Sequence, residues 1–176
     1  MTERIKTITD YKPAKAFLKK KLFWYLLPNL IFNGIIPYFS FKNPAAVSLF
    51  QGEFCFARFI LPMALFVPLA ITVDFMKKTT EFFATANIGK LWSEEQVNMR
   101  FFLREGIYNG LKTFLIVLII MLVVQWSLPT NSTFDGLLLA CINGGMACLI
   151  AAYFTLVSVK QMNTILEEYI DTVEQN

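Results

Sequence analysis

Histidine is absent from this sequence of 176 residues, and charged residues are scarce. Lysine, arginine, aspartate and glutamate make up 16% of the chain, whereas a soluble domain usually has about 25%. Without histidine, the chain has no imidazole to act as base, proton shuttle or metal ligand. The shortage of charge also makes an ordinary water-soluble domain a poor fit.

The recognisable parts of enzymes and metal sites are missing as well. Cys55, Cys141 and Cys148 are odd in number, fall in or beside apolar segments and show no CxxC or other metal-site spacing. The sequence has no glycine-rich phosphate loop and no nucleophile elbow. We therefore expect no enzyme, no bound metal and no cofactor. A lipid-active enzyme built from scattered residues is the alternative that stays open.

Apolar residues make up 56% of the chain and gather in four blocks. Residues 22–41 and 137–159 are uncharged runs long enough for the roughly 20 residues that a helix needs to cross a bilayer. Residues 59–73 and 113–128 are shorter, but flanking charged side chains can reach the interface by snorkelling. The blocks predict four membrane spans, at about 22–41, 57–76, 109–128 and 137–159.

A soluble bundle with buried helices is the alternative to this interpretation. Each helix of such a bundle would need a polar face, and the first and fourth blocks show none. The expected fold class is therefore an all-α, polytopic bundle of four transmembrane helices. Residues 1–21 form a basic segment before it, and residues 160–176 form an acidic, amphipathic tail after it.

Basic residues predict the orientation of the bundle. The two loops on one side contain only Lys42 and Arg58. Such an asymmetry places the basic side in the cytoplasm, so both termini are expected there, in a bacterial inner membrane or its equivalent. No nucleic-acid partner is needed to explain the charge. The other fourteen basic residues lie on the opposite side: Arg4, Lys6, Lys12, Lys15, Lys19, Lys20, Lys21, Lys77, Lys78, Lys90, Arg100, Arg104, Lys112 and Lys160.

The two halves of the chain share a pattern that suggests a duplication. Residues 27–34 match residues 103–110 at four positions, including Asn33-Gly34 with Asn109-Gly110. Met63-Ala64, Thr72 and Lys77 recur 83 residues later. These matches favour two parallel two-helix repeats, although apolar helices also match by chance.

The alignment raises the question of how deep Arg104, Glu105 and Lys112 lie. If the copies superpose, these residues are intramembrane, where ionisable groups are functional candidates. In the simpler interpretation, which we favour, the third helix begins in the cytoplasm and these residues lie at its solvated base.

The cytoplasmic connections are also expected to be helical. Ser93 and Gln96 fit a capping box, which predicts a third helix from about residue 94 to 128. In the tail, Val159, Met162, Leu166, Tyr169 and Val173 follow a heptad spacing. Two heptads are too few for a coiled coil, so simple amphipathic packing is the better interpretation.

The fourth block carries a stripe of small residues every four positions: Ala140, Gly144, Cys148 and Ala152. Small residues allow two helix backbones to approach closely in lipid, where packing replaces the hydrophobic effect. This stripe is a helix-packing candidate. Its partner is either another helix of the same chain, which we favour slightly, or a second copy.

Four polar residues within the apolar blocks are candidates for a polar pathway. Asn29 and Asn33 lie one turn apart in the first span, between Pro28 and Pro37. Asp74 is the only acid in the second span, and Asn143 lies in the fourth. Such groups need partners in hydrocarbon. Hydrogen bonding between helices, or for Asp74 an interfacial ion pair with Lys77 or Lys78, is the simpler interpretation.

Two classes of function remain after these exclusions. The first is a non-catalytic membrane component: an accessory, assembly or scaffold subunit that docks a membrane-protein partner or a second copy in the lipid bilayer. The alternative is a small oligomeric transporter or channel for a small solute or ion, with Asn29, Asn33, Asn143 and Asp74 near its pathway. The scarcity of buried charge favours the first.

Overall fold

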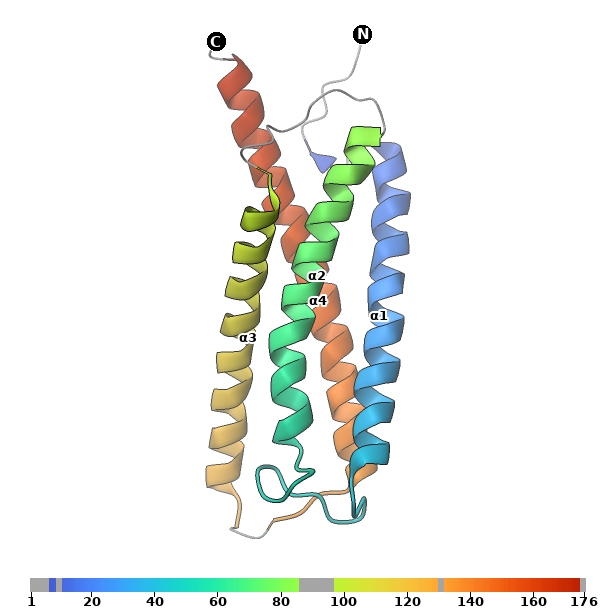
Figure 1. Ribbon diagram of the computed structural model, residues 1–176, viewed down its shortest axis with the longest axis vertical. Helices are drawn as coiled ribbons and strands as arrows, with labels where there is room; N and C mark the ends of the chain where they lie inside the picture. The colour runs from blue at the N-terminus through green and yellow to red at the C-terminus, as the bar shows by residue number, and fades with distance from the viewer. Residues whose placement is uncertain (1–6, 9–10, 86–96, 130–131, 175–176) are drawn as a thin grey trace.

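The computed structural model describes residues 1–176 except 1–6, 9–10, 86–96, 130–131 and 175–176. The described chain forms four long helices: α1 (Lys12–Ser40), α2 (Ala57–Thr85), α3 (Met99–Ser127) and α4 (Gly136–Glu174). They lie lengthwise beside one another, with the start of α1 and the end of α4 at the same end of the bundle (Figure 1). We call this the terminal end, and the opposite end the loop end.

The predicted all-α bundle of four membrane-spanning helices is confirmed, since all four helices are long and apolar enough to cross a membrane. The surface agrees with this assignment. Large apolar side chains such as Phe39, Trp126 and Leu149 are mostly exposed. A continuous apolar surface of this kind would be a liability in water but is the natural outer face of a bundle in lipid.

The helices begin and end at positions that differ from the apolar blocks. Helix α1 begins ten residues before its block, because lysine is a good helix former and Pro13 fits the first turn. Helix α3 begins at Met99, five residues later than expected, and the Asn98 side chain caps it by accepting a hydrogen bond from the Phe101 N–H at 2.9 Å. The predicted capping box at Ser93 and Gln96 lies outside the described residues.

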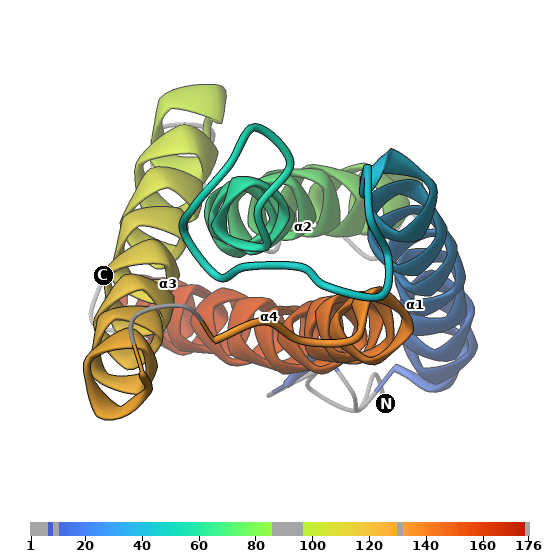
Figure 2. The ribbon, with the colours of Figure 1, turned by 90° about the horizontal axis from the view of Figure 1, so that it is seen from below.

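Helices α2 and α4 form the centre of the bundle. Helix α3 packs against α2, α1 packs against α4, and α1 touches α2 much less (Figure 2). The exposure of the helices agrees with this arrangement, because α1 is largely exposed and α2 is the most buried of the candidate spans.

The buried side chains form two apolar clusters. The larger cluster fills the loop-end part of the bundle, where residues of α2 up to Ile71 meet residues of α4 up to Phe154. The smaller cluster lies at the terminal end and joins Met76 and Phe83 of α2 to Phe102 of α3 and Met162 of α4. In the tail, Met162 and Leu166 are fully buried, whereas the Tyr169 and Val173 side chains lie outside the described set.

The loop end is closed by the two connections that meet there (Figure 2). Val47 and Phe134 exchange backbone hydrogen bonds of 2.8 Å, and the Gly136 N–H donates to the Pro44 carbonyl oxygen. The first connection turns at Gly52, whose φ of +88° suits glycine. Its apolar side chains fold inward, so the end of the bundle is covered by buried residues: Phe41, Val47, Leu49 and Phe56.

The first connection, between α1 and α2, carries an ion pair whose contribution to stability should depend on pH. The Lys42 ammonium, 2.5 Å from Glu53 Oε2, holds the pKa of the Glu53 carboxyl below its ordinary value of 4.5. A lowered pKa in the folded protein means that the pair stabilises the loop above the unfolded-state pKa and that this contribution disappears as the pH falls. We expect Lys42→Ala to raise the Glu53 pKa in an NMR titration. An identical pKa in both proteins would show that the pair does not form.

Candidate functional site

A ladder of polar side chains follows one face of α1. Tyr25, Asn29 and Asn33 are spaced four residues apart, so their side chains lie above one another. The Asn29 amide donates to the Tyr25 carbonyl oxygen at 2.8 Å, and the Asn33 amide donates to the Asn29 carbonyl oxygen at 3.0 Å. The amide donors are thereby satisfied within the helix, as hydrocarbon requires.

Each end of the ladder joins another helix. Tyr25 donates its hydroxyl to Asp74 Oδ2 of α2 at 2.7 Å, and Lys78 pairs with Asp74 Oδ1 at 2.8 Å. At the other end, the Asn143 amide of α4 donates to the Asn33 carbonyl oxygen at 2.8 Å. The structure thus brings all four polar-pathway candidates, Asn29, Asn33, Asp74 and Asn143, into one hydrogen-bonded chain. Tyr25, which completes it, was missed, although its four-residue spacing to Asn29 was a usable signal.

Proline explains why Asn143 binds where it does. Pro37 has no N–H, so it cannot donate the helical hydrogen bond that the Asn33 carbonyl, four residues earlier, would otherwise accept. The buried Asn143 amide supplies the missing donor from α4. Its own Oδ1 has no partner within the described residues. The proline and the asparagine therefore fix the register of α1 on α4.

The small-residue stripe of α4 faces α1 in the same chain. A methyl group at Gly144 would lie 3.1 Å from the Leu30 carbonyl oxygen and 3.2 Å from Gly34 Cα. Cys148 Sγ donates to the Leu26 carbonyl oxygen at 3.4 Å. Ala140 is buried and its carbonyl oxygen lies near Gly34, whereas Ala152 is half-buried. All three cysteines are free, and Cys55 is buried.

Gly144→Leu should therefore push α1 away from α4. We expect a lower unfolding temperature, because overpacking a tight contact costs about 1–3 kcal/mol. We expect no change in oligomer size, since the stripe is already covered within the chain. A stable variant that changes only in oligomer size, measured by light scattering in detergent, would instead place the stripe between copies.

A second close contact joins α3 to α2 and was not identified from the sequence. Methyl groups at Gly106 and Gly110 would lie 3.0 Å from the Leu69 and 2.6 Å from the Leu65 carbonyl oxygens. Between these glycines, the buried Asn109 amide donates to Thr72 Oγ1 at 3.1 Å. The missed signal was Gly106-x-x-x-Gly110, a spacing that brings membrane helices together.

Several buried polar side chains lie in the terminal half of the bundle, within and beside the smaller apolar cluster. They include the fully buried hydroxyls of Thr79 and Ser158, neither of which has a hydrogen-bond partner among the described groups. Gln161 Nε2 of α4 donates to Glu105 Oε2 of α3 at 2.9 Å at the same end of the bundle. The unpartnered Thr79 and Ser158 hydroxyls could therefore bind a small polar molecule such as water.

The depth of the charged residues on α3 follows from helix geometry. Trp126, 92% exposed, is of the type that marks a membrane interface. At 1.5 Å per residue, Lys112 lies about 21 Å and Arg104 about 33 Å from it along the helix, against a hydrocarbon layer of about 30 Å. This supports the favoured interpretation for Arg104 and Glu105, which lie at the base of α3. It does not support it for Lys112, which lies about 9 Å inside the hydrocarbon layer, from where its side chain can snorkel to the interface.

Among the described residues, no group of three or more Cys, Asp or Glu side chains is placed to hold a metal ion. No protein-family model matches the chain, and no curated protein or solved structure is significantly similar to it.

Proposed function

We propose that this chain is a non-catalytic accessory, assembly or scaffold subunit of a membrane complex. The observation that carries the proposal is the apolar, filled centre of the bundle. Small side chains of α2 and α4, such as Ala64 and Ala147, are fully buried there. A solute pathway needs a polar or open centre and a mouth, and the loop end is covered by buried apolar residues.

The use of the polar residues supports the same proposal. The Asn143 amide supplies the donor that Pro37 lacks, and the Asn109 amide bonds Thr72 across α2 and α3. Polar side chains of this kind hold membrane helices together. They contribute to the assembly of the bundle and leave few groups to select a solute.

We propose that the partner protein docks at the terminal end of the bundle. We also propose that this end is cytoplasmic, in a bacterial inner membrane or its equivalent. Helix α4 has 39 residues and so measures about 58 Å, nearly twice the hydrocarbon thickness of about 30 Å. Its extension is anchored by the smaller apolar cluster through Met162. Thr164, Glu167 and Glu168 remain exposed on it, and the two glutamates give a partner protein an acidic helix face.

Site-specific photo-crosslinking in the native membrane tests this proposal. A photoreactive residue at position 164 or 167 should give one discrete adduct with a second protein. The matched control is position 156, an exposed leucine on the lipid-facing part of the same helix, where lipid adducts are expected. If positions 164 and 167 give only lipid or self adducts, the docking assignment fails.

We also propose that the chain arose by duplication of a helix pair, with α1 equivalent to α3 and α2 to α4. Burial supports this pairing, since ten of the twelve buried residues of α2 correspond, 83 positions later, to buried residues of α4. Packing supports it too, because the first helix of each half packs on the second helix of the other half. The register differs by about two turns. Gly34 approaches Ala140 and Gly144, which correspond to Ala57 and Leu61 of α2, whereas Gly110 approaches Leu65 and Leu69.

A small oligomeric transporter is the second candidate, favoured by one observation. Asn143 Oδ1, Thr79 Oγ1 and Ser158 Oγ are buried without partners within the described part of the chain. Unpartnered buried oxygens can coordinate a small cation or water during transport.

A flux assay in proteoliposomes decides whether this candidate survives. If the protein is a transporter, Asp74→Asn should abolish pH-dependent uptake, because the amide cannot change charge. The control is Glu81→Gln, which removes an exposed acid of the same helix that pairs with Lys77 at 3.9 Å. Absence of flux from the wild-type protein would eliminate the transporter, and full flux in Asp74→Asn would remove Asp74 from it.

A further inference from the structure

Two lysines lie near one carboxylate in the terminal half of the bundle. Lys78 and the Tyr25 hydroxyl occupy the two oxygens of Asp74, at 2.8 and 2.7 Å. Lys21, one turn before Tyr25 on the same face of α1, interacts with both Lys78 and Asp74. With two ammonium groups and one carboxylate, the cluster has a net charge of 2 − 1 = +1.

Among the described residues, the nearby acidic side chains are too few to cancel this charge. Helix α1 contains no acidic residue, and its first turns add further lysines. The closest acid on α2 beyond Asp74 is Glu81, which pairs with Lys77 at 3.9 Å. Lys21 is held over the Phe17 ring, 5.7 Å from its centre. Among the described residues, the cluster thus keeps one positive charge more than Asp74 neutralises.

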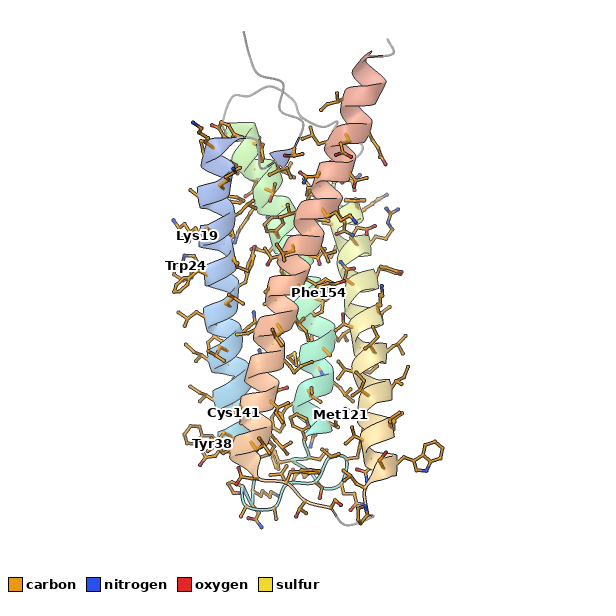
Figure 3. The ribbon with its side chains drawn as sticks, turned by 180° about the vertical axis from the view of Figure 1, so that it is seen from behind. Lys19, Trp24, Tyr38, Met121, Cys141 and Phe154 are labelled. Atoms are coloured by element: carbon orange, nitrogen blue, oxygen red, sulfur yellow. The ribbon has the colours of Figure 1, made fainter. Side chains whose placement is uncertain are left out.

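The surroundings of the cluster indicate what kind of anion fits. Trp24 and Phe32 follow Lys21 at spacings that keep them near the same face of α1, and each is 60% exposed. Figure 3 shows Lys19 and Trp24 pointing away from the bundle at this level of α1. Helix α1 packs mainly on α4 and makes less contact with α2. Exposed apolar side chains therefore follow Lys21 along α1.

We propose that Lys21 and Lys78 bind the phosphate of an anionic phospholipid, whose acyl chains lie along Trp24 and Phe32. Basic groups between transmembrane helices at the membrane surface are suited to lipid headgroups. Asp74 and Tyr25 act as positioning residues, because they hold Lys78 beside Lys21 and do not touch the lipid. The proposal depends on membrane insertion and is independent of whether the protein is an accessory subunit.

Native mass spectrometry from mixed nanodiscs tests the site. Phosphatidylglycerol and phosphatidylcholine with identical chains are offered at equal amounts. The wild-type protein should retain phosphatidylglycerol, and Lys21→Gln/Lys78→Gln should reduce this preference by about 30-fold, from about 1 kcal/mol for each lysine. The control Lys19→Gln/Lys77→Gln has the same net charge and removes exposed lysines outside the cluster, so it should keep the preference.

Several results would overturn the proposal. Equal loss in both double variants would mean that diffuse surface charge attracts the lipid. Equal retention of phosphatidylcholine by the wild type would mean that no anion site exists. Thermal stabilisation by millimolar inorganic phosphate as strong as that by phosphatidylglycerol would assign the site to a soluble phosphate. If the double variant does not fold, Lys21→Gln alone, which leaves the Lys78–Asp74 pair intact, should reduce the preference by about fivefold.

Discussion

Gly110→Ala is expected to lower the stability of the bundle more than a methyl group added at any other described helical glycine. The new methyl would lie 2.6 Å from the Leu65 carbonyl oxygen and 3.5 Å from side-chain atoms of Leu65 and Leu69. The carbonyl belongs to the backbone of a central helix and cannot move aside, so α3 must shift away from α2. Overpacking of this kind costs about 1–3 kcal/mol, measurable by unfolding in dodecyl sulfate mixed micelles.

The chain offers a matched control for this substitution. Gly145 is also a helical glycine of a membrane-spanning helix, but nothing lies within 4 Å of where its methyl group would be. Gly145→Ala should leave stability unchanged or raise it by up to about 1 kcal/mol, the usual difference in helix propensity. If the two variants have the same stability, α2 and α3 do not approach as closely as the structure has them.

Met162→Ala is expected to loosen the terminal end of α4. Met162 is fully buried, and it packs in the smaller cluster with Met76, Phe83 and Phe102. Truncating a buried methionine to alanine usually costs about 2–5 kcal/mol. If this loss lowers only the free energy of local opening of α4, a loss of about 2 kcal/mol makes the open form roughly 30-fold more populated. The expected result is faster protease cleavage of the α4 extension in nanodiscs.

Thr164→Ala is the control, since Thr164 is exposed two residues further along the same helix. It should be cleaved at the wild-type rate. Equal rates for Met162→Ala and Thr164→Ala would mean that the extension does not pack on the rest of the bundle, and the docking proposal would lose its rigid surface.

Apolar run length predicted two of the four helices directly, and the other two with flanking charged residues at the interface. An uncharged stretch such as residues 137–159 cannot leave its backbone unbonded in hydrocarbon, so helix is the only outcome. The helix ends were less predictable. Helix α1 runs on through Lys19–Lys21 because lysine favours helix, and Asn98 caps α3 where the sequence also offered Ser93.

Which helices touch was the part that the sequence did not decide. The stripe around Gly144 indicated a packing face but not its partner, since apolar helices pair without a strong sequence code. The partner, α1, is selected by a combination of features: Gly34 leaves room for Gly144, and Pro37 frees a carbonyl for Asn143. Such complementarity becomes visible only when two helices are placed side by side.

The role of Asp74 illustrates the same limit. Its ion pair with Lys78 was among the sequence-based alternatives, because the two lie four residues apart on one helix. The bond from Tyr25 joins residues 49 positions apart. No local pattern predicts it, and with it Asp74 becomes part of the packing between α1 and α2.

Gentle extraction of the tagged protein from its native membrane, followed by native mass spectrometry, tests the accessory-subunit proposal most directly. The proposal predicts a stoichiometric complex with a second protein, weakened by Glu167→Lys, a change at an exposed position that leaves the buried Met162 and Leu166 in place. A homo-oligomer without any other protein, which in proteoliposomes also carries out solute flux, would contradict the proposal and establish the chain as an autonomous transporter.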